Sequence, residues 1–202
     1  MPASLMIAAA LVHLLPSRLA TSLTTRRFLQ KVSVILLGIV LTGHVLSALP
    51  VLLVKTFSVG EGRDKIVTEK RKMSLRGEGM REALTVIEEL IGKEETFTVV
   101  PEGVMLNYLA RRRSTVPYMN FMPTEFTIFG QSTILQSFKD DPPDFIIIAD
   151  KEAAEWGYRY FGHPGYGENV FRWILDNYQP VKQILNKPLS GQGFGILIVR
   201  KK

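Results

Sequence analysis

The feature that most constrains this chain is a run of 23 consecutive residues without a formal charge, from Val32 to Val54. Lys31 and Lys55 bracket the run. At 1.5 Å per residue, a helix of this length reaches roughly 34 Å, which is enough to cross a hydrocarbon core of about 30 Å with some tilt. The run therefore predicts a membrane-spanning helix that carries the more polar remainder of the chain.

The excess of basic residues lies at this apolar end. Residues 1–55 hold five Lys or Arg and no acid, whereas the rest of the chain holds 20 basic and 19 acidic residues. Almost all of the formal charge of +6 is therefore next to apolar segments, where anionic lipid headgroups are the simplest partner. We expect contact with membrane lipid and no binding of nucleic acid. The absence of cysteine excludes disulfides, thiol nucleophiles and cysteine-ligated zinc.

A second apolar segment, residues 3–17, precedes the first. No Lys or Arg comes before it, which disfavours a signal peptide, so we expect a transmembrane helical hairpin with a basic connection over 18–31. The four basic residues of that connection favour the cytoplasmic side, but seven more lie between residues 55 and 76. Charge alone thus leaves the topology open.

Beyond the membrane segment, residues 56–76 lack a clear period and are interpreted as a juxtamembrane linker. Residues 77–202 are long enough for one domain with its own core. Apolar spacing and turn residues predict helices over 80–91, 104–109, 131–138 and 167–178, and strands over 96–100, 117–121, 145–149, 181–185 and 194–199.

This alternation of strands and helices predicts a small three-layer α/β domain. We expect a mostly parallel sheet that ends in a C-terminal antiparallel hairpin. Ligands of such sheets bind beyond the carboxyl ends of the strands, which selects Glu102, Asn120 and Asp150 as residues that converge at one edge. As one hypothesis, Glu102 and Asp150 form an acid/base pair.

An aromatic and glycine-rich segment runs from Glu155 to Tyr166. Its Trp156 and tyrosines are suited either to stacking on a sugar ring or to packing on their own domain. Tyr160 and His163 are the candidate binding residues here. The domain's single histidine has no triad partner in a recognisable elbow and no paired spacing for zinc, so we assign no catalytic and no metal-ligating residue. No Walker A loop and no GxGxxG is present, and we expect no cofactor.

Several short motifs together carry a family resemblance. They are Val100-Pro-Glu-Gly103, Leu106-Asn-Tyr-Leu109 followed by Arg112, Pro142-Pro-Asp-Phe-Ile-Ile-Ile148, Tyr160-Phe-Gly162, Trp173-Ile174, Asn177-Tyr178 and Phe194-Gly-Ile-Leu-Ile-Val-Arg200. The series resembles the C-terminal end of bacterial polytopic glycosyltransferases of the protein-mannosyltransferase type, which belong to glycosyltransferase family 39 and the GT-C class. The second motif adds Asn107 as a candidate binding residue.

The resemblance implies a membrane-anchored module of an enzyme that takes a sugar from a polyprenyl-phosphate donor. The catalytic acids of that family lie in the first extracytoplasmic loop, and residues 1–55 contain no carboxylate. We therefore expect a module that assists donor or acceptor binding, that is inactive alone, and whose soluble domain lies outside the inner membrane. The alternative is a non-catalytic, membrane-anchored binding or scaffold protein that docks on another membrane protein subunit.

Overall fold

The computed structural model describes residues 22–69 and 74–202. The chain divides into two compact units, Met1–Val54 and Lys55–Lys202, and each is described by itself. The predicted apolar helix over residues 3–17 lies outside the described residues.

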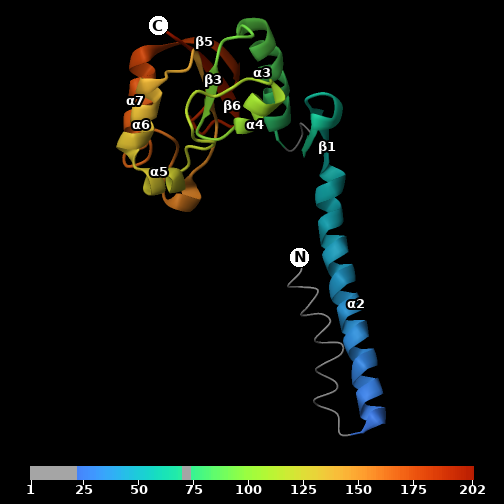
Figure 1. Cartoon of the computed structure of the whole chain (residues 1–202). Coiled ribbons are helices and arrows are strands. Elements are labelled where there is room, and N and C mark those ends of the chain that lie inside the picture. The colour runs from blue at the N-terminus through green and yellow to red at the C-terminus, as the bar shows by residue number, and fades with distance from the viewer. Residues whose placement is uncertain (1–21, 70–73) are drawn as a thin grey trace. The chain divides into compact units, whose positions relative to one another are not determined.

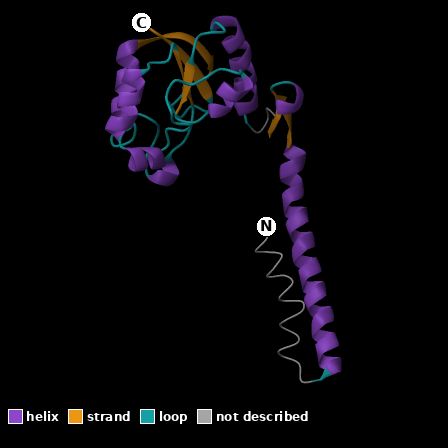
Figure 2. Cartoon of the chain, in the orientation of Figure 1, coloured by secondary structure: helices purple, strands orange, loops and turns teal. Residues whose placement is uncertain are grey.

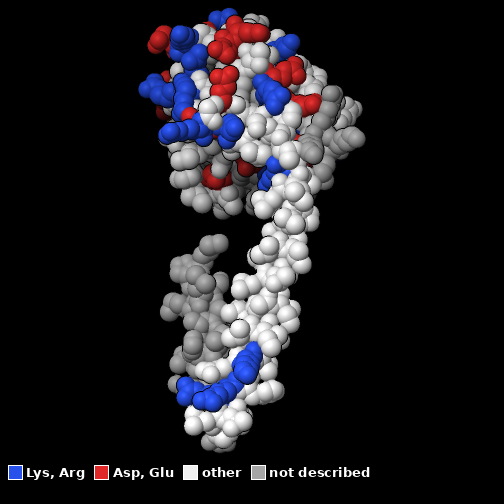
Figure 3. Space-filling view, turned by 90° about the vertical axis from the view of Figure 1, so that its right-hand side faces the viewer, with Lys and Arg blue, Asp and Glu red and all other residues white. Residues whose placement is uncertain are grey.

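The first unit contains one long helix, α2 (Leu23–Val54, 32 residues). Ser22 begins it, because its Oγ accepts a hydrogen bond from the backbone N–H of Thr25 at 3.2 Å. At 1.5 Å per residue α2 is about 48 Å long. Figure 3 shows Lys and Arg side chains gathered at one end of this helix and no charge along the rest of it.

Among the described residues, α2 is the one helix long and apolar enough to cross a membrane. The transmembrane hairpin is thus not supported, and the polar connection over 18–31 is wrong in part. Residues 23–31 are helical, because long basic side chains at a helix end extend their charges away from the helix without interrupting the backbone hydrogen bonds.

The second unit begins with a two-stranded antiparallel hairpin in the segment interpreted as a linker. Strand β1 (Lys55–Val59) follows α2 without an intervening residue, and β2 (Ile66–Glu69) pairs with it. The short 3-10 helix η1 (Gly62–Asp64) forms the turn. Both strands are short and partly exposed, so they lack the continuous apolar run that marks a buried strand in a sequence.

The central sheet has four strands in the order β3-β4-β6-β5. Their bounds are β3 (Phe97–Val100), β4 (Phe145–Ala149), β5 (Tyr178–Leu185) and β6 (Gly195–Lys201). Only β3 and β4 are a parallel pair, so the expectation of a mostly parallel sheet is wrong and the sheet is mixed. The C-terminal hairpin is confirmed, but its second strand lies between β4 and β5, which makes both pairings of β6 antiparallel.

Helices cover both faces of this sheet. Helices α3 (Arg76–Leu90) and α4 (Val104–Leu109) pack on one face, and α6 (Gln131–Asp140) and α7 (Glu168–Asn177) pack on the other. Figures 1 and 2 show the strands between these two groups of helices. The expected three layers and all four expected helices of the domain are therefore present.

Alternation along the buried strands builds two cores. Phe145 and Ile147 of β4 face the core beneath α3, whereas Ile146 and Ile148 face the core beneath α6 and α7. All five residues of β4 are buried, as the continuous apolar run predicts.

Residues 117–121 do not form the expected strand. Pro117 has no N–H to donate, and the backbone bond from Phe121 N to Pro101 O (2.7 Å) joins only the end of the segment to the turn after β3. The segment leads instead into a short helix, α5 (Pro123–Phe129), which begins with proline at its first position.

Candidate functional site

The carboxyl ends of the two parallel strands meet as the sequence predicts. Val100 of β3 is paired with Ile148 of β4, so the residues that follow each strand are neighbours. Glu102 Oε2 lies 2.8 Å from Lys151 Nζ, and this ion pair joins the turn after β3 to the loop after β4. Glu102 therefore lies at the predicted edge, but its partner is a lysine that the sequence argument did not select.

Gly103 fixes the turn that carries Glu102. Its φ is +153°, and a Cβ at this position would lie 2.5 Å from Cγ1 of Val99. A side chain of any kind would collide with the strand that has just ended. The turn Pro101-Glu-Gly103 thus requires glycine, and this requirement holds Glu102 at the edge of the sheet.

Asp150 lies at the same edge of the sheet, but its contacts there are structural. Its Oδ1 accepts a hydrogen bond from the backbone N–H of Leu189 at 2.7 Å, and its own N–H donates to Gly195 O at 2.9 Å. These contacts tie the end of β4 to the loop between β5 and β6 and to the first residue of β6. With Glu102 bonded to Lys151, the two carboxylates of the proposed acid/base pair have separate partners.

Tyr166 and Glu125 extend this edge, and Glu125 was not expected there. Tyr166 is fully buried, and its hydroxyl donates to Phe121 O at 2.9 Å. Burial raises the pKa of Tyr166 above its ordinary value, and the negative charges of Glu125 and Glu102 raise it further. Glu125 belongs to the first turn of α5. The proline at Pro123 followed by an acid is the sequence signal for such a helix start.

The aromatic segment packs largely on its own domain. Full burial of Tyr166 contradicts the stacking role on a sugar ring that its sequence suggested. Tyr160 is half-buried against His163 (ring centroids 6.2 Å apart), and the Arg159 guanidinium lies over the Tyr160 ring at 5.8 Å. His163 also contacts Tyr158, which stacks on Tyr166. These rings therefore form one cluster that ends beside the edge with Glu102.

The two candidate asparagines occupy different places. Asn107 is buried, and its Nδ2 donates to Phe97 O at 2.7 Å and to Arg112 O at 3.3 Å. It thus joins the end of α4 to the start of β3, far along the strand from the predicted edge, and it has a structural role. Asn120 is half-buried and adjacent to Phe121, whose N–H bonds to Pro101 O near that edge.

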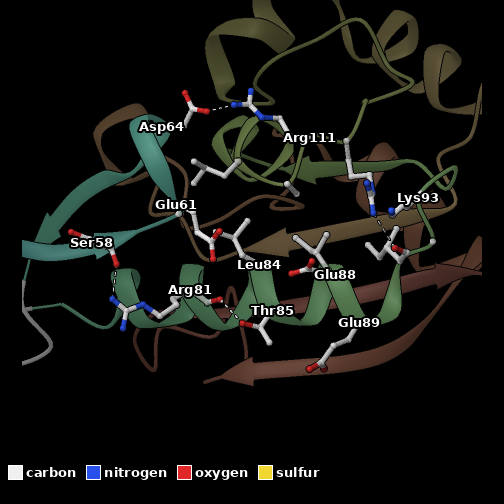
Figure 4. Close-up of a pocket in the computed structure, with 17 residues that line it drawn as sticks. Ser58, Glu61, Asp64, Arg81, Leu84, Thr85, Glu88, Glu89, Lys93 and Arg111 are labelled. Atoms are coloured by element: carbon white, nitrogen blue, oxygen red, sulfur yellow. Dashed lines mark hydrogen bonds and ion pairs between the residues drawn. The ribbon is translucent and has the colours of Figure 1, made fainter.

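A cleft of about 930 Å³ lies elsewhere in the second unit. Its walls are the β1–η1 segment, one side of α3 and the chain that follows α4 (Figure 4). Charged side chains of both signs line it: Glu61, Asp64, Arg81, Glu88, Glu89, Lys93, Arg111 and Arg112. None of these residues was selected from the sequence as a candidate binding residue.

Some of these charged side chains form ion pairs or hydrogen bonds within the domain. Arg111 forms an ion pair with Asp64, and Tyr108 donates to the other oxygen of that carboxylate at 2.7 Å. Arg81 donates to Ser58 O at 2.5 Å. These contacts attach the β1–η1 wall to the chain after α4 and to α3, so they set the width of the cleft.

Other polar groups of the cleft have hydrogen-bonding capacity that no contact within the domain uses fully. Arg112 Nε is buried without a hydrogen-bond partner among the described residues, and its Nη2 reaches only Ile91 O at 3.5 Å. Glu61 and Glu88 point into the cleft from opposite walls (Figure 4). The cleft thus offers strong donors and strong acceptors close together. This combination suits a neutral ligand rich in hydroxyl groups better than an isolated anion, which the two carboxylates would repel.

No group of three or more His, Cys, Asp or Glu that could hold a metal ion occurs among the described residues. In comparisons with known proteins, no family model, no curated protein and no solved structure matches the chain. What the fold itself defines is an α/β domain with a mixed sheet, preceded by one long apolar helix.

Proposed function

We propose that this chain is a membrane-anchored module of a lipid-phosphate-sugar-dependent glycosyltransferase, in which the α/β domain binds the sugar part of the donor or acceptor. The observation that carries the proposal is the cleft of about 930 Å³ with its paired donors and acceptors. Sugar hydroxyls donate to carboxylates and accept from guanidinium groups, so Glu61, Glu88 and Arg112 provide both halves of such recognition.

The anchor supports the same proposal. Helix α2 is long and apolar enough to span a bilayer, and β1, a wall of the cleft, follows it directly. The cleft therefore belongs to the segment of the domain nearest in sequence to the membrane, where a polyprenyl-linked sugar is held. In this proposal the catalytic acids come from another segment or another membrane protein subunit, and the soluble domain is extracytoplasmic.

Binding is tested on the full chain in lipid nanodiscs, free of glycoside detergents that would compete. Saturation-transfer NMR is recorded with a methyl hexoside, an N-acetylhexosamine and a polyprenyl-phosphate hexose. We expect saturable transfer to the sugar protons, lost in Glu88→Gln and in Arg112→Lys, since lysine keeps the charge but loses the planar guanidinium with its several donors. Glu82→Gln, on the same helix and outside the cleft, is the matched control. Absence of transfer to all three sugars would overturn the proposed sugar site.

The side of the membrane is tested separately. Alkaline phosphatase and green fluorescent protein are fused in turn after residue 202. The proposal expects phosphatase activity and no fluorescence, and the reverse result rejects an extracytoplasmic domain.

The second candidate function is a non-catalytic scaffold, and one observation favours it. Glu102 and Asp150, the pair of the acid/base hypothesis, are both held by partners within the domain. Sugar binding that persists while no condition or partner subunit yields hexosyl transfer would favour this alternative.

A further inference from the structure

An apolar tip projects from the second unit, and the chain's own core does not use it. It consists of Met119, Ile128 and Phe129, whose exposed fractions are 73%, 72% and 47%. The Tyr118 ring lies 5.0 Å from the ring of Phe129, which brings the loop with Met119 against α5. The tip is therefore one surface built from two segments.

The fold itself holds these side chains outward. Phe126 of α5 is buried and packs on Phe161 and Tyr166. At 3.6 residues per turn, Ile128 lies about 200° around the helix from Phe126, so it faces away from the core. The same burial that anchors α5 thus exposes Ile128.

The sequence around the tip is unusually poor in charge. From Ser114 to Phe138, 25 residues, the one charged side chain is Glu125, and Arg113 and Lys139 bracket the stretch. Glu125 acts on Tyr166 at the sheet edge. An exposed apolar surface within a segment that holds one charged residue, bracketed in sequence by cations, has the composition of a surface that enters a bilayer interface beside anionic headgroups.

We propose that the apolar tip inserts into the interfacial layer of the membrane that α2 spans. We assign the bilayer as the partner of the tip because the domain is covalently attached to the proposed membrane helix. Strand β1 follows Val54 without a linker, so contact between the domain and this membrane is intramolecular and occurs at high effective concentration. Insertion of the isoleucine, phenylalanine and methionine removes their apolar surface from water. The inference requires the anchor but does not require the proposed sugar site.

The absence of cysteine provides a direct test. Ile128→Cys in the full chain is labelled with an environment-sensitive fluorophore and reconstituted into vesicles of phosphatidylcholine and phosphatidylglycerol. We expect a blue-shifted emission that is quenched by lipids with a quencher in the upper acyl chain. Glu82→Cys, exposed on α3, is the matched control and should report water.

Two results would overturn the proposal. One is a label at residue 128 that emits as it does in water. The other is a blue shift that appears only as the protein-to-lipid ratio rises, which would assign the tip to a second copy of the chain. Since Ile128 is outside the core, the labelled variant retains the fold, and its circular dichroism spectrum verifies this.

Discussion

At the scale of single residues, Asn107 shows how a candidate binding residue becomes a structural one. Its amide bonds the carbonyls of Phe97 and Arg112, both inside the domain. Asn107→Ala leaves these acceptors unsatisfied, and we expect a loss of about 1–3 kcal/mol in the free energy of unfolding. Denaturant unfolding measures it. Asn169→Ala, at an exposed position of α7, should stay within about 0.5 kcal/mol of the parent chain.

The buried tyrosines predict a dependence on alkaline pH. The pKa values of Tyr166 and Tyr178 are raised from the ordinary 10.0, mainly by burial. Because these pKa values are higher in the folded state, the stabilisation is complete below pH 10 and is lost as pH rises further, when the unfolded chain releases the protons first.

Tyr166→Phe therefore should reduce the slope of stability against pH above 10, as well as lower stability at neutral pH by removing the bond to Phe121 O. Unfolding free energies at several alkaline pH values test both effects. An unchanged alkaline slope in Tyr166→Phe would show that this hydroxyl ionises as freely in the fold as in the unfolded chain.

Sequence reasoning placed Glu102 and Asp150 correctly at one edge because parallel strand ends are a property of topology. It could not assign their partners. Glu102 contacts Lys151, and Asp150 contacts the backbone of Leu189. Both contacts depend on how the loops fold, which the apolar spacing of the sequence does not indicate.

At the scale of elements, Gly103 tests the turn that follows β3. Gly103→Ala puts a Cβ against Val99 in addition to the left-handed φ. Gly157→Ala tests the cost of a positive φ without a collision, because no atom lies within 4 Å of its added Cβ. We expect Gly157→Ala to cost about 1–2 kcal/mol and Gly103→Ala to cost clearly more. Thermal unfolding of both variants measures the difference, and equal losses would contradict the proposed collision.

Strongly periodic elements were predictable and short partly exposed ones were not. The helix α3 and the strand β4 follow from apolar spacing alone. The β1–β2 hairpin and α5 are short elements with weak patterns, and their formation depends on neighbours such as Arg81 and Phe161. The cleft depends on that hairpin, which explains why the sequence indicated no site there.

At the scale of the whole molecule, the basic residues near the start of α2 bear on orientation. In the proposed topology Arg26, Arg27 and Lys31 keep that end of the helix cytoplasmic. Replacing all three with glutamine should move part of the population to the opposite orientation, as reporters fused after residue 202 would detect. Neutralising Lys93, Arg111 and Arg113 is the matched control, since these charges lie farther from α2 in sequence. An unaltered orientation in the first variant would assign topology to other determinants.

The sheet has one further consequence in the proposed membrane-anchored state. Lateral diffusion in two dimensions brings identical domains together often, and an unpaired strand at the end of a sheet can template polymerisation. Strand β5 is such an end, but Pro180 lacks a donor, Lys182 adds charge, and the register shifts between them. These features make β5 a poor template, so this end of the sheet resists pairing with a second copy of the chain in the bilayer plane of the proposed anchor.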